Sequence, residues 1–233
     1  MTRTPPPEAL PQGSDKARAV RAMFDAVAPR YDLVNRVMTF GLDRRWRRLT
    51  VAALDLPAGS TVADLACGTG DLCADLAGAG LTPIGFDLSA GMLAAAHTTA
   101  PLVRADVVSL PLPAASVDGA TCGFALRNLV DLRAFLAELA RIVRPGGRIG
   151  LLEVAEPSHP ALRLGHRFYF TRVVPRIGAA LSDATAYRYL PRSVVYLPPV
   201  DVLVGAVAEA GFPDVHRRAL SGGIVQLLVG TRS

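Results

Sequence analysis

One segment, Thr61–Asp71, constrains the fold of this chain more than any other. It reads TVADLACGTGD, an apolar run that contains a carboxylate, Asp64, and ends in a glycine-rich turn. Apolar residues at helical spacing follow from Leu72, so the segment predicts a strand, a tight turn and a helix in that order. Gly68 and Gly70 let the backbone approach a ligand closely, and the helix N-terminus offers free N–H groups.

The spacing of this turn selects among nucleotide-containing ligands. Ala66 stands where the dinucleotide fingerprint has its first glycine, and no Lys-Ser or Lys-Thr pair follows as in a phosphate-binding loop. An acid just before the glycines suits a cationic, amino-acid-like ligand better than a pyrophosphate. We therefore expect Asp64, Gly68 and Gly70 to bind S-adenosylmethionine. The alternative is an ordinary strand–helix turn without a ligand.

Two further acids end predicted strands. Asp87 closes the apolar segment 83–87, about 20 residues beyond the glycines, where an acid binds ribose hydroxyls in doubly wound folds. Asp106 follows the segment 102–105. Because the carboxyl ends of parallel strands meet at one sheet edge, we expect Asp64, Asp87 and Asp106 in register at the ligand-binding edge. Each acid taken alone has an equally simple alternative as a helix cap.

Strands and helices alternate through the middle of the chain, which predicts an α/β fold with a parallel sheet. The helices begin near Asp71, Ser89 and Asp131, and Arg144-Pro-Gly-Gly147 ends the last of them. A helix over 200–210 precedes a closing hairpin. The predicted strands cover 61–66, 83–87, 102–105, 117–123, 148–155, 215–219 and 224–229.

The chain divides into five predicted regions. They are a flexible leader (1–19), N-terminal helices (20–56), a Rossmann-like cofactor-binding core (57–156), a substrate lid (157–199), and a C-terminal helix with its hairpin (200–233). The lid is rich in proline, aromatic residues and arginine, and it follows the fifth strand beside the cofactor edge. Functional segments concentrate in such insertions, although a packing appendage is the alternative.

The sequence predicts a cytoplasmic protein. Of its 233 residues, 51% are hydrophobic and 19% charged, as in a globular protein. No apolar run approaches the roughly 20 residues that cross a bilayer, and the N-terminus lacks the apolar core of a signal peptide. The three cysteines lack metal-ligand spacing, so we expect reduced thiols and no metal.

The net charge of +5 comes almost wholly from arginine. The one dense basic cluster is 43–48, where a helix would place Trp46 inward and several arginines outward. Such a face is either simply solvated or a contact for anionic lipid headgroups, which would make the protein peripheral at the inner face of the membrane. No nucleic-acid-binding motif is present, and we expect no nucleic-acid partner.

Separated motifs along the chain carry a family resemblance. They are Met23-Phe24 with Tyr31-Asp32 and Asn35; Gly41 with Arg45-Trp46-Arg47; the turn Asp64–Asp71; Phe124-Ala-Leu-Arg-Asn128; Arg144-Pro-Gly-Gly147; Tyr187-Arg-Tyr-Leu190; and Gly222-Gly-Ile-Val225. With these motifs the chain resembles class I S-adenosylmethionine-dependent methyltransferases, and more narrowly the ubiquinone/menaquinone biosynthesis C-methyltransferases. The resemblance implies a seven-stranded Rossmann-like sheet with helices on both faces. It also implies methylation of a prenylated quinol such as demethylmenaquinol, with S-adenosylhomocysteine as product; a homodimer is compatible with it.

The resemblance also assigns cofactor-binding residues. Thr69 matches the cofactor-contacting threonine of the turn, Asp87 the ribose-binding acid, and Asp106 with Val107 the pair beside the adenine. Gly123 stands where many members have a cofactor-contacting serine, so that contact must come from backbone or be absent.

The substrate half departs further from the family. Ala125 replaces a glycine, Glu153-Val-Ala-Glu156 replaces a Glu-Phe-Ser pattern, and Gln226-Leu-Leu replaces an Ala-Leu-His. These changes leave two alternatives open: a methyltransferase acting at carbon or oxygen of a soluble aromatic or polyketide acceptor, and a protein that binds S-adenosylmethionine without transferring methyl.

A ring carbon is a poor nucleophile unless an adjacent phenol is ionised, so the site should stabilise a phenolate and accept a ring proton. Arg127, which is always protonated, is the first candidate for the phenolate, with a structural salt bridge to an acid such as Asp131 as the alternative. Tyr31 and Tyr187 are candidate hydrogen-bonding residues, Asp183 is a candidate proton acceptor, and His166 is a weaker candidate base.

Overall fold

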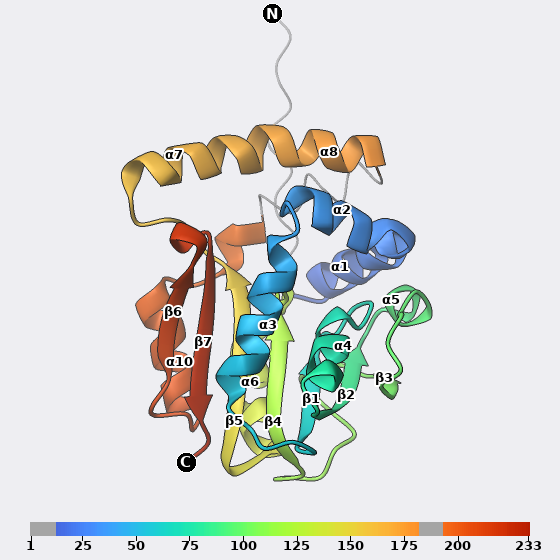
Figure 1. Ribbon diagram of the computed structural model, residues 1–233, viewed down its shortest axis with the longest axis vertical. Helices are drawn as coiled ribbons and strands as arrows, with labels where there is room; N and C mark the ends of the chain where they lie inside the picture. Colours follow the sequence, from blue (N-terminus) through green and yellow to red (C-terminus); the bar gives the residue numbers. More distant parts are fainter. Residues whose placement is uncertain (1–12, 182–192) are drawn as a thin grey trace, which may run out of the picture.

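A seven-stranded sheet forms the centre of the structure, a computed structural model that describes residues 13–181 and 193–233. The strand order is β3-β2-β1-β4-β5-β7-β6 (Figure 1). Strands β1 to β5 run parallel, whereas β7 is antiparallel to both β5 and β6. The predicted α/β fold with a Rossmann-like sheet and a closing antiparallel pair is confirmed. The strands are Thr61–Leu65 (β1), Thr82–Asp87 (β2), Leu102–Arg104 (β3), Val117–Gly123 (β4), Val143–Val154 (β5), His216–Leu220 (β6) and Val225–Thr231 (β7).

Helices cover both faces of this sheet. In Figure 1, α3 and α4 lie in front of the sheet, and α6 and α10 lie behind it. Because both faces are covered, Val62, Ala63 and Leu65 of β1 are all fully buried, and β1 reads as an apolar run instead of an alternating pattern. The helices are Gly13–Val27 (α1), Tyr31–Met38 (α2), Leu42–Leu54 (α3), Asp71–Gly78 (α4), Ala90–Ala94 (α5), Leu132–Ile142 (α6), Pro160–Phe168 (α7), Val174–Leu181 (α8) and Val200–Glu209 (α10).

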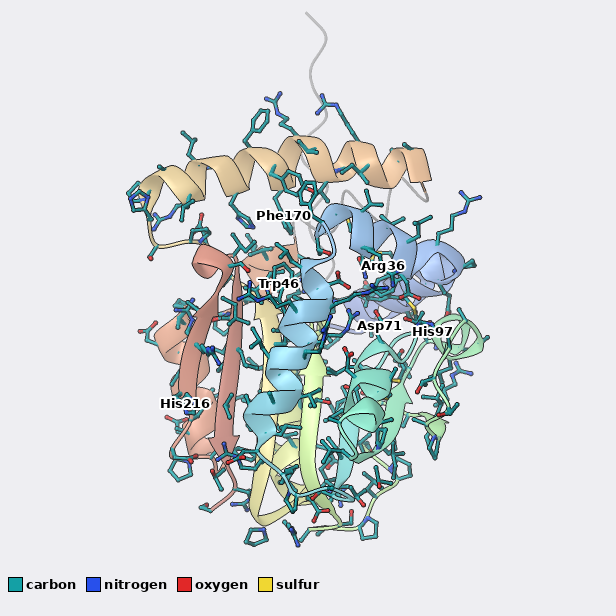
Figure 2. The ribbon with its side chains drawn as sticks, viewed as in Figure 1. Arg36, Trp46, Asp71, His97, Phe170 and His216 are labelled. Carbon is teal, nitrogen blue, oxygen red and sulfur yellow. The ribbon has the colours of Figure 1, made fainter. Side chains whose placement is uncertain are left out.

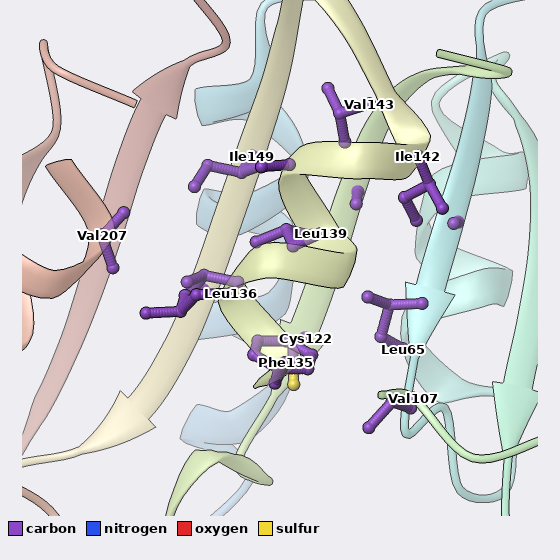
Figure 3. Packing of buried hydrophobic residues seen from close by; sticks show 14 of the residues in the cluster. Leu65, Val107, Cys122, Phe135, Leu136, Leu139, Ile142, Val143, Ile149 and Val207 are labelled. Carbon is purple, nitrogen blue, oxygen red and sulfur yellow. The ribbon is translucent and has the colours of Figure 1, made fainter. Parts of the chain in front are cut away.

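The main core lies between the sheet and the helices behind it. Phe135, Leu136 and Leu139 of α6 pack against the sheet together with Ile149 of β5, and Val207 of α10 joins the same cluster (Figure 3). The spacing of these α6 residues is the helical periodicity read from the sequence. Burial of this face fixes α6 on the sheet and therefore fixes the loop before it, which carries Arg127.

The predicted helix starts near Asp71, Ser89 and Asp131 are confirmed, and the last two are capped by their side chains. The backbone N–H of Met92 donates to the Ser89 hydroxyl over 3.1 Å, and that of Ala134 donates to Asp131 over 2.9 Å. Each bond satisfies a donor that has no partner within its own helix. Asp131 is therefore occupied as the cap of α6.

Strand β5 begins five residues earlier than predicted, at Val143. The pairing with β4 shifts between Val117↔Val143 and Gly119↔Arg148, so Arg144-Pro-Gly-Gly147 forms a bulge within the strand. A Cβ atom at Gly147 would lie only 2.7 Å from the carbonyl oxygen of Asp118. Glycine is required at position 147 because the backbone of β4 comes too close for a side chain. This contact between distant segments is not visible in the sequence pattern.

The N-terminal helix is anchored through the chain's one lysine. The Lys16 ammonium donates to the carbonyl of Leu129 over 2.6 Å and lies 3.7 Å from the ring centroid of Tyr196. Burial of this group lowers the pKa of Lys16 to about 8. Residues 13–19 therefore belong to α1, and the predicted flexible leader 1–19 extends too far at its C-terminal end.

Helices α7 and α8 lie across the carboxyl ends of the strands (Figure 1), joined by a π-helical turn over Tyr169–Val173. The Tyr169 hydroxyl donates to the carbonyl of Met38 over 2.8 Å, which ties this turn to the end of α2. Within the part of the chain that the structure describes, no helix is both long and apolar enough to cross a membrane.

The close packing of β4 against β5 predicts opposite effects for two glycine substitutions. A Cβ atom at Gly119 would lie 2.8 Å from the carbonyl oxygen of Arg148, whereas one at Gly205 in α10 would meet no atom within 4 Å. We expect Gly119→Ala to lower the free energy of unfolding by about 1–3 kcal/mol. Gly205→Ala should raise it by about 0.5–1 kcal/mol through helix propensity. Urea unfolding measures both, and a Gly119→Ala protein as stable as wild type would contradict the β4–β5 packing.

Candidate active site

A cavity of about 540 Å³ opens at the carboxyl ends of the strands, beneath α7. One end is formed by the glycine turn with Gly68 and Thr69, and the other by apolar side chains from α2, α3 and α7. In Figure 2, Phe170 lies between the α7–α8 helix and Trp46, and Asp71 and His97 lie lower, beside α4. The larger apolar residues that line the cavity are Phe24, Met38, Phe40, Trp46, Phe124, Tyr169, Phe170 and Ile224.

The glycine turn adopts the conformation that its sequence predicts. Gly68 and Gly70 have φ values of 57° and 83°. A Cβ atom at Gly70 would lie 2.4 Å from the Thr98 side chain, so no larger residue fits there. The N–H of Gly68 donates to Asp87 over 2.8 Å, which fixes the turn against the end of β2.

Asp87 is held in a defined orientation beside the turn. Its other carboxylate oxygen accepts the N–H of Ser89 over 2.8 Å. Burial is the main influence on this group and raises the pKa of Asp87. Asp87 thus lies where a ribose-binding acid is expected, although its side chain is not among the cavity-lining residues.

The three strand-end acids share one edge of the sheet but are not in register. Asp64 pairs opposite Gly85, two residues before Asp87, and Asp87 pairs opposite Arg104, two residues before Asp106. The predicted register is therefore wrong: the acids form a diagonal across the edge. Each strand starts at a different height, which a sequence pattern alone does not specify.

Asp64 lies at the buried floor of the cavity, only 1% exposed. Its two oxygens accept the hydroxyl of Thr121 over 2.8 Å and the thiol of Cys73 over 3.3 Å. Burial raises the pKa of Asp64 to about 7. With this pKa, the carboxyl is partly protonated near neutral pH.

Thr69 connects the turn to the N-terminal helices. Its hydroxyl donates to Asp32 of α2 over 2.7 Å. His97 lies 3.5 Å from Asp32 and 3.1 Å from Asp71 at the start of α4. Helix α2 is thus fastened over the glycine turn by polar contacts.

Arg47 of α3 is a site residue that sequence reasoning missed. Its guanidinium bridges Asp43 at 2.9 Å, Asp71 at 2.9 Å and Asp75 at 3.2 Å. Trp46 is buried as predicted, and its indole N–H donates to Ser221 over 2.8 Å. The predicted outward arginine face is thus wrong for Arg47 and confirmed for Arg44, Arg45 and Arg48, which are exposed. Asp43 four residues before it was the available signal, because charges at that spacing pair on a helix.

Of the remaining predicted cofactor residues, Asp106, Val107 and Gly123, only Gly123 lines the cavity. Asp106 is exposed and Val107 belongs to the main core, and neither is among the residues that line the cavity. Gly123 does line it, and a Cβ atom there would come no closer than 3.8 Å to Leu72. The backbone thus leaves room for a side chain as small as serine at this position.

Arg127 forms a buried ion pair at the cavity wall. Its guanidinium pairs with Glu153 at the end of β5, and its backbone N–H donates to the same carboxylate over 3.2 Å. The guanidinium also donates to the carbonyl of Phe124 over 2.8 Å and to Ser193 over 3.2 Å. Among the contacts of the described residues, none involves its Nη2 atom. The partner considered from sequence, Asp131, is wrong; Glu153 takes that role.

Two of the other candidate catalytic residues line the cavity, and two lie outside the described residues. Tyr31 lines the cavity, packs edge-on against Phe24 at 6.0 Å between ring centroids, and has a pKa raised by burial. His166 also lines the cavity, with its ring 4.9 Å from that of Phe170 and a pKa lowered by burial. Tyr187 and Asp183 lie outside the described residues.

The departures at the C-terminal end lie in the sheet and not in the cavity. Gln226 is buried, pairs opposite Glu153, and accepts from Arg217 over 2.7 Å. Leu228 belongs to the core behind the sheet. The neighbouring Ile224 and Val225, which match the family motif, are the residues that line the cavity.

Known proteins share this architecture over nearly the whole chain. Residues 12–232 match the model of the ubiE/COQ5 methyltransferase family. The chain is 42% identical to the ubiquinone/menaquinone biosynthesis C-methyltransferase UbiE of Syntrophotalea carbinolica, over 91% of this chain and 94% of that protein. It is 40% identical to the demethylmenaquinone methyltransferase of Roseiflexus castenholzii, over 96% of this chain and 97% of that protein.

A solved S-adenosylmethionine-dependent methyltransferase from Thermotoga maritima has the same fold. It superposes with a TM-score of 0.60 over 91% of this chain and 99% of that chain, at 19% sequence identity. The chain therefore belongs to the ubiE/COQ5 methyltransferase family, and it is an enzyme that uses S-adenosylmethionine as methyl donor.

Proposed function

We propose that this enzyme transfers methyl from S-adenosylmethionine to a ring carbon of a prenylated quinol such as demethylmenaquinol. The observation that carries the proposal is a single cavity that joins the glycine turn to an apolar chamber bordered by Arg127. The names of the relatives in quinone biosynthesis support the same acceptor. The products are S-adenosylhomocysteine and the C-methylated quinol.

The protein's main task in this reaction is alignment. The sulfonium methyl is already activated, so the enzyme must hold donor and acceptor together and exclude water. Asp64, Gly68, Thr69, Gly70 and Asp87 would hold the donor, with Asp106 and Val107 beside its adenine. Gly123 would contact the donor through its backbone. The aromatic walls formed by Trp46, Phe124 and Phe170 would exclude water from the acceptor.

Arg127 would stabilise the phenolate that makes the ring carbon nucleophilic. Its charge is fixed, and Glu153 with Ser193 holds the guanidinium in one orientation at the cavity wall. After methyl transfer the ring carbon must lose its proton to a base. We assign that role to Asp183, with His166 as the weaker candidate, because the pKa of His166, lowered by burial, keeps its imidazole neutral and able to accept a proton. Tyr31 and Tyr187 would act as hydrogen-bonding residues.

The two alternatives receive less support. Among the departures that favoured a soluble acceptor, Gln226 and Leu228 are buried in the sheet away from the cavity, whereas Val154 of the segment 153–156 lines it. An S-adenosylmethionine-binding protein without transferase activity is not favoured by the relatives, which are methyltransferases by name. A lipid-soluble acceptor implies that the enzyme works from the cytoplasm at the membrane surface. The proposal also includes a homodimer.

The proposed reaction can be tested directly with purified enzyme. Purified enzyme incubated with methyl-labelled S-adenosylmethionine and demethylmenaquinol should form labelled menaquinol and an equal amount of S-adenosylhomocysteine. Mass spectrometry locates the methyl on carbon or on oxygen. Turnover only on water-soluble phenols would contradict the proposed acceptor.

The second prediction separates the catalytic from the structural role of Arg127. Arg127→Gln should lower turnover by about 10²–10³-fold with little change in S-adenosylmethionine affinity. It should also destabilise the fold by about 3–5 kcal/mol, because Glu153 is left charged and buried. The double variant Arg127→Gln/Glu153→Gln should recover most of the free energy of unfolding but not the turnover. Recovery of both would make Arg127 purely structural.

The third prediction follows from the raised pKa of Asp64. Approach of the cationic cofactor favours the ionised carboxyl, so binding near pH 7 should release protons, and cofactor affinity should rise between about pH 6 and pH 8. Calorimetry in buffers of different ionisation enthalpy measures the released protons. Asp64→Asn should remove both the proton release and the pH dependence; identical proton release in that variant would assign the effect to another group.

A further inference from the structure

The helical segment that crosses the top of the molecule is basic. Residues 157–181 contain four arginines and neither aspartate nor glutamate. The four are Arg163, Arg167, Arg172 and Arg176, and all are exposed. In Figure 1 this segment, α7 with α8, is the outermost layer at the carboxyl ends of the strands.

Its two faces differ. Tyr169, Phe170 and Val174 face the body of the protein, and Val174 is buried. Leu164 and Phe168, one helical turn apart, are 74% and 62% exposed. Large apolar side chains exposed beside arginines are typical of a helix that lies in a lipid–water interface.

Apolar residues of α2 and the turn after it are also exposed, next to the α7–α8 segment. Phe40 is 77% exposed, and its ring centroid lies 5.7 Å from that of Tyr169 at the junction of α7 and α8. Leu33 and Val37 of α2 are 55% and 40% exposed, and α2 packs against α8. We call Leu33, Val37, Phe40, Leu164 and Phe168, with Arg167 and Arg172, the interfacial face.

The cavity lies directly beneath this face. Gly165 and His166 of α7 line it, and so do Phe40 and Tyr169. A single helix therefore presents one side to the acceptor chamber and the other side to the exterior. A prenyl tail that leaves the chamber beside α7 would emerge at the interfacial face.

We propose that the interfacial face docks on an anionic lipid bilayer and that the acceptor enters the cavity from that bilayer. The apolar side chains enter the acyl–headgroup boundary, and the arginines pair with anionic headgroups. The entry of the acceptor from the bilayer rests on the proposed function, whereas the docking itself does not. It also relocates the lipid contact from the predicted cluster 43–48, where Arg47 is held by three aspartates within the protein.

Vesicle sedimentation tests the docking without any enzyme assay. Wild-type protein should bind vesicles of equal phosphatidylglycerol and phosphatidylcholine at least about ten-fold more tightly than pure phosphatidylcholine vesicles, and added salt should weaken the binding. Leu164→Glu with Phe168→Glu should reduce binding to anionic vesicles about ten-fold or more. Arg167→Gln with Arg172→Gln should remove the preference for anionic lipid.

Arg218→Glu is the matched control. It changes the net charge by the same two units as Leu164→Glu with Phe168→Glu, at an exposed position on β6. It should reduce vesicle binding far less. An equal loss with Arg218→Glu would show that net charge, and not this face, governs binding, and would overturn the proposal. A second outcome would also overturn the proposal. In it, the wild-type protein does not bind vesicles, analytical ultracentrifugation shows a dimer, and Leu164→Glu with Phe168→Glu dissociates that dimer.

The two proposals fail separately. Leu164 and Phe168 do not line the cavity, so the double variant should keep its turnover on a short-chain quinol dissolved without vesicles. It should lose turnover on long-chain quinol held in anionic vesicles. Vesicle binding without any methyl transfer would refute the acceptor and leave the docking; methyl transfer from vesicles unaffected by the double variant would refute the docking.

Discussion

The ion pair between Arg127 and Glu153 is the interaction on which the acceptor side of the site depends. It joins the loop after β4 to the end of β5, and Ser193 extends it to the C-terminal part of the predicted lid. Two charges removed from water are stable only when each is paired and hydrogen-bonded. The pair is therefore possible only while both strand ends and residue 193 keep their positions, so the fold holds a fixed positive charge at the wall of an apolar cavity.

The donor side depends on a different constraint, the backbone of the glycine turn. Asp87 accepts the Gly68 N–H, Asp64 is buried beneath the turn, and Thr69 is bonded to Asp32 of α2. Arg47 adds a second polar link from α3 to the start of α4. The N-terminal helices thus form a wall of the donor site. Because they are far from the turn in sequence, the sequence pattern does not reveal this role.

The parts that sequence predicted are those that local rules specify. The strand–turn–helix at Asp64–Asp71, the caps at Ser89 and Asp131, and the buried Trp46 follow from patterns within a few residues. The failures depend on contacts between distant segments. Glu153 lies 26 residues from Arg127, the acids are staggered because neighbouring strands begin at different heights, and the bulge at Gly147 depends on Asp118 of another strand. The side of α7 that faces outward depends on the packing of α8 against α2 and on the bond from Tyr169 to the Met38 carbonyl. Periodicity in a segment interrupted by proline does not specify these contacts.

We infer that one cavity holds donor and acceptor, with Arg127 at the acceptor and α7 above its tail. A crystal structure with S-adenosylhomocysteine and a short-chain demethylmenaquinol analogue tests it most directly. We predict the ribose hydroxyls on Asp87, the quinol oxygen within hydrogen-bond reach of Arg127, and the tail emerging beside Gly165 and His166. A quinol ring bound away from Arg127, or a tail that leaves between α3 and α4, would contradict the account.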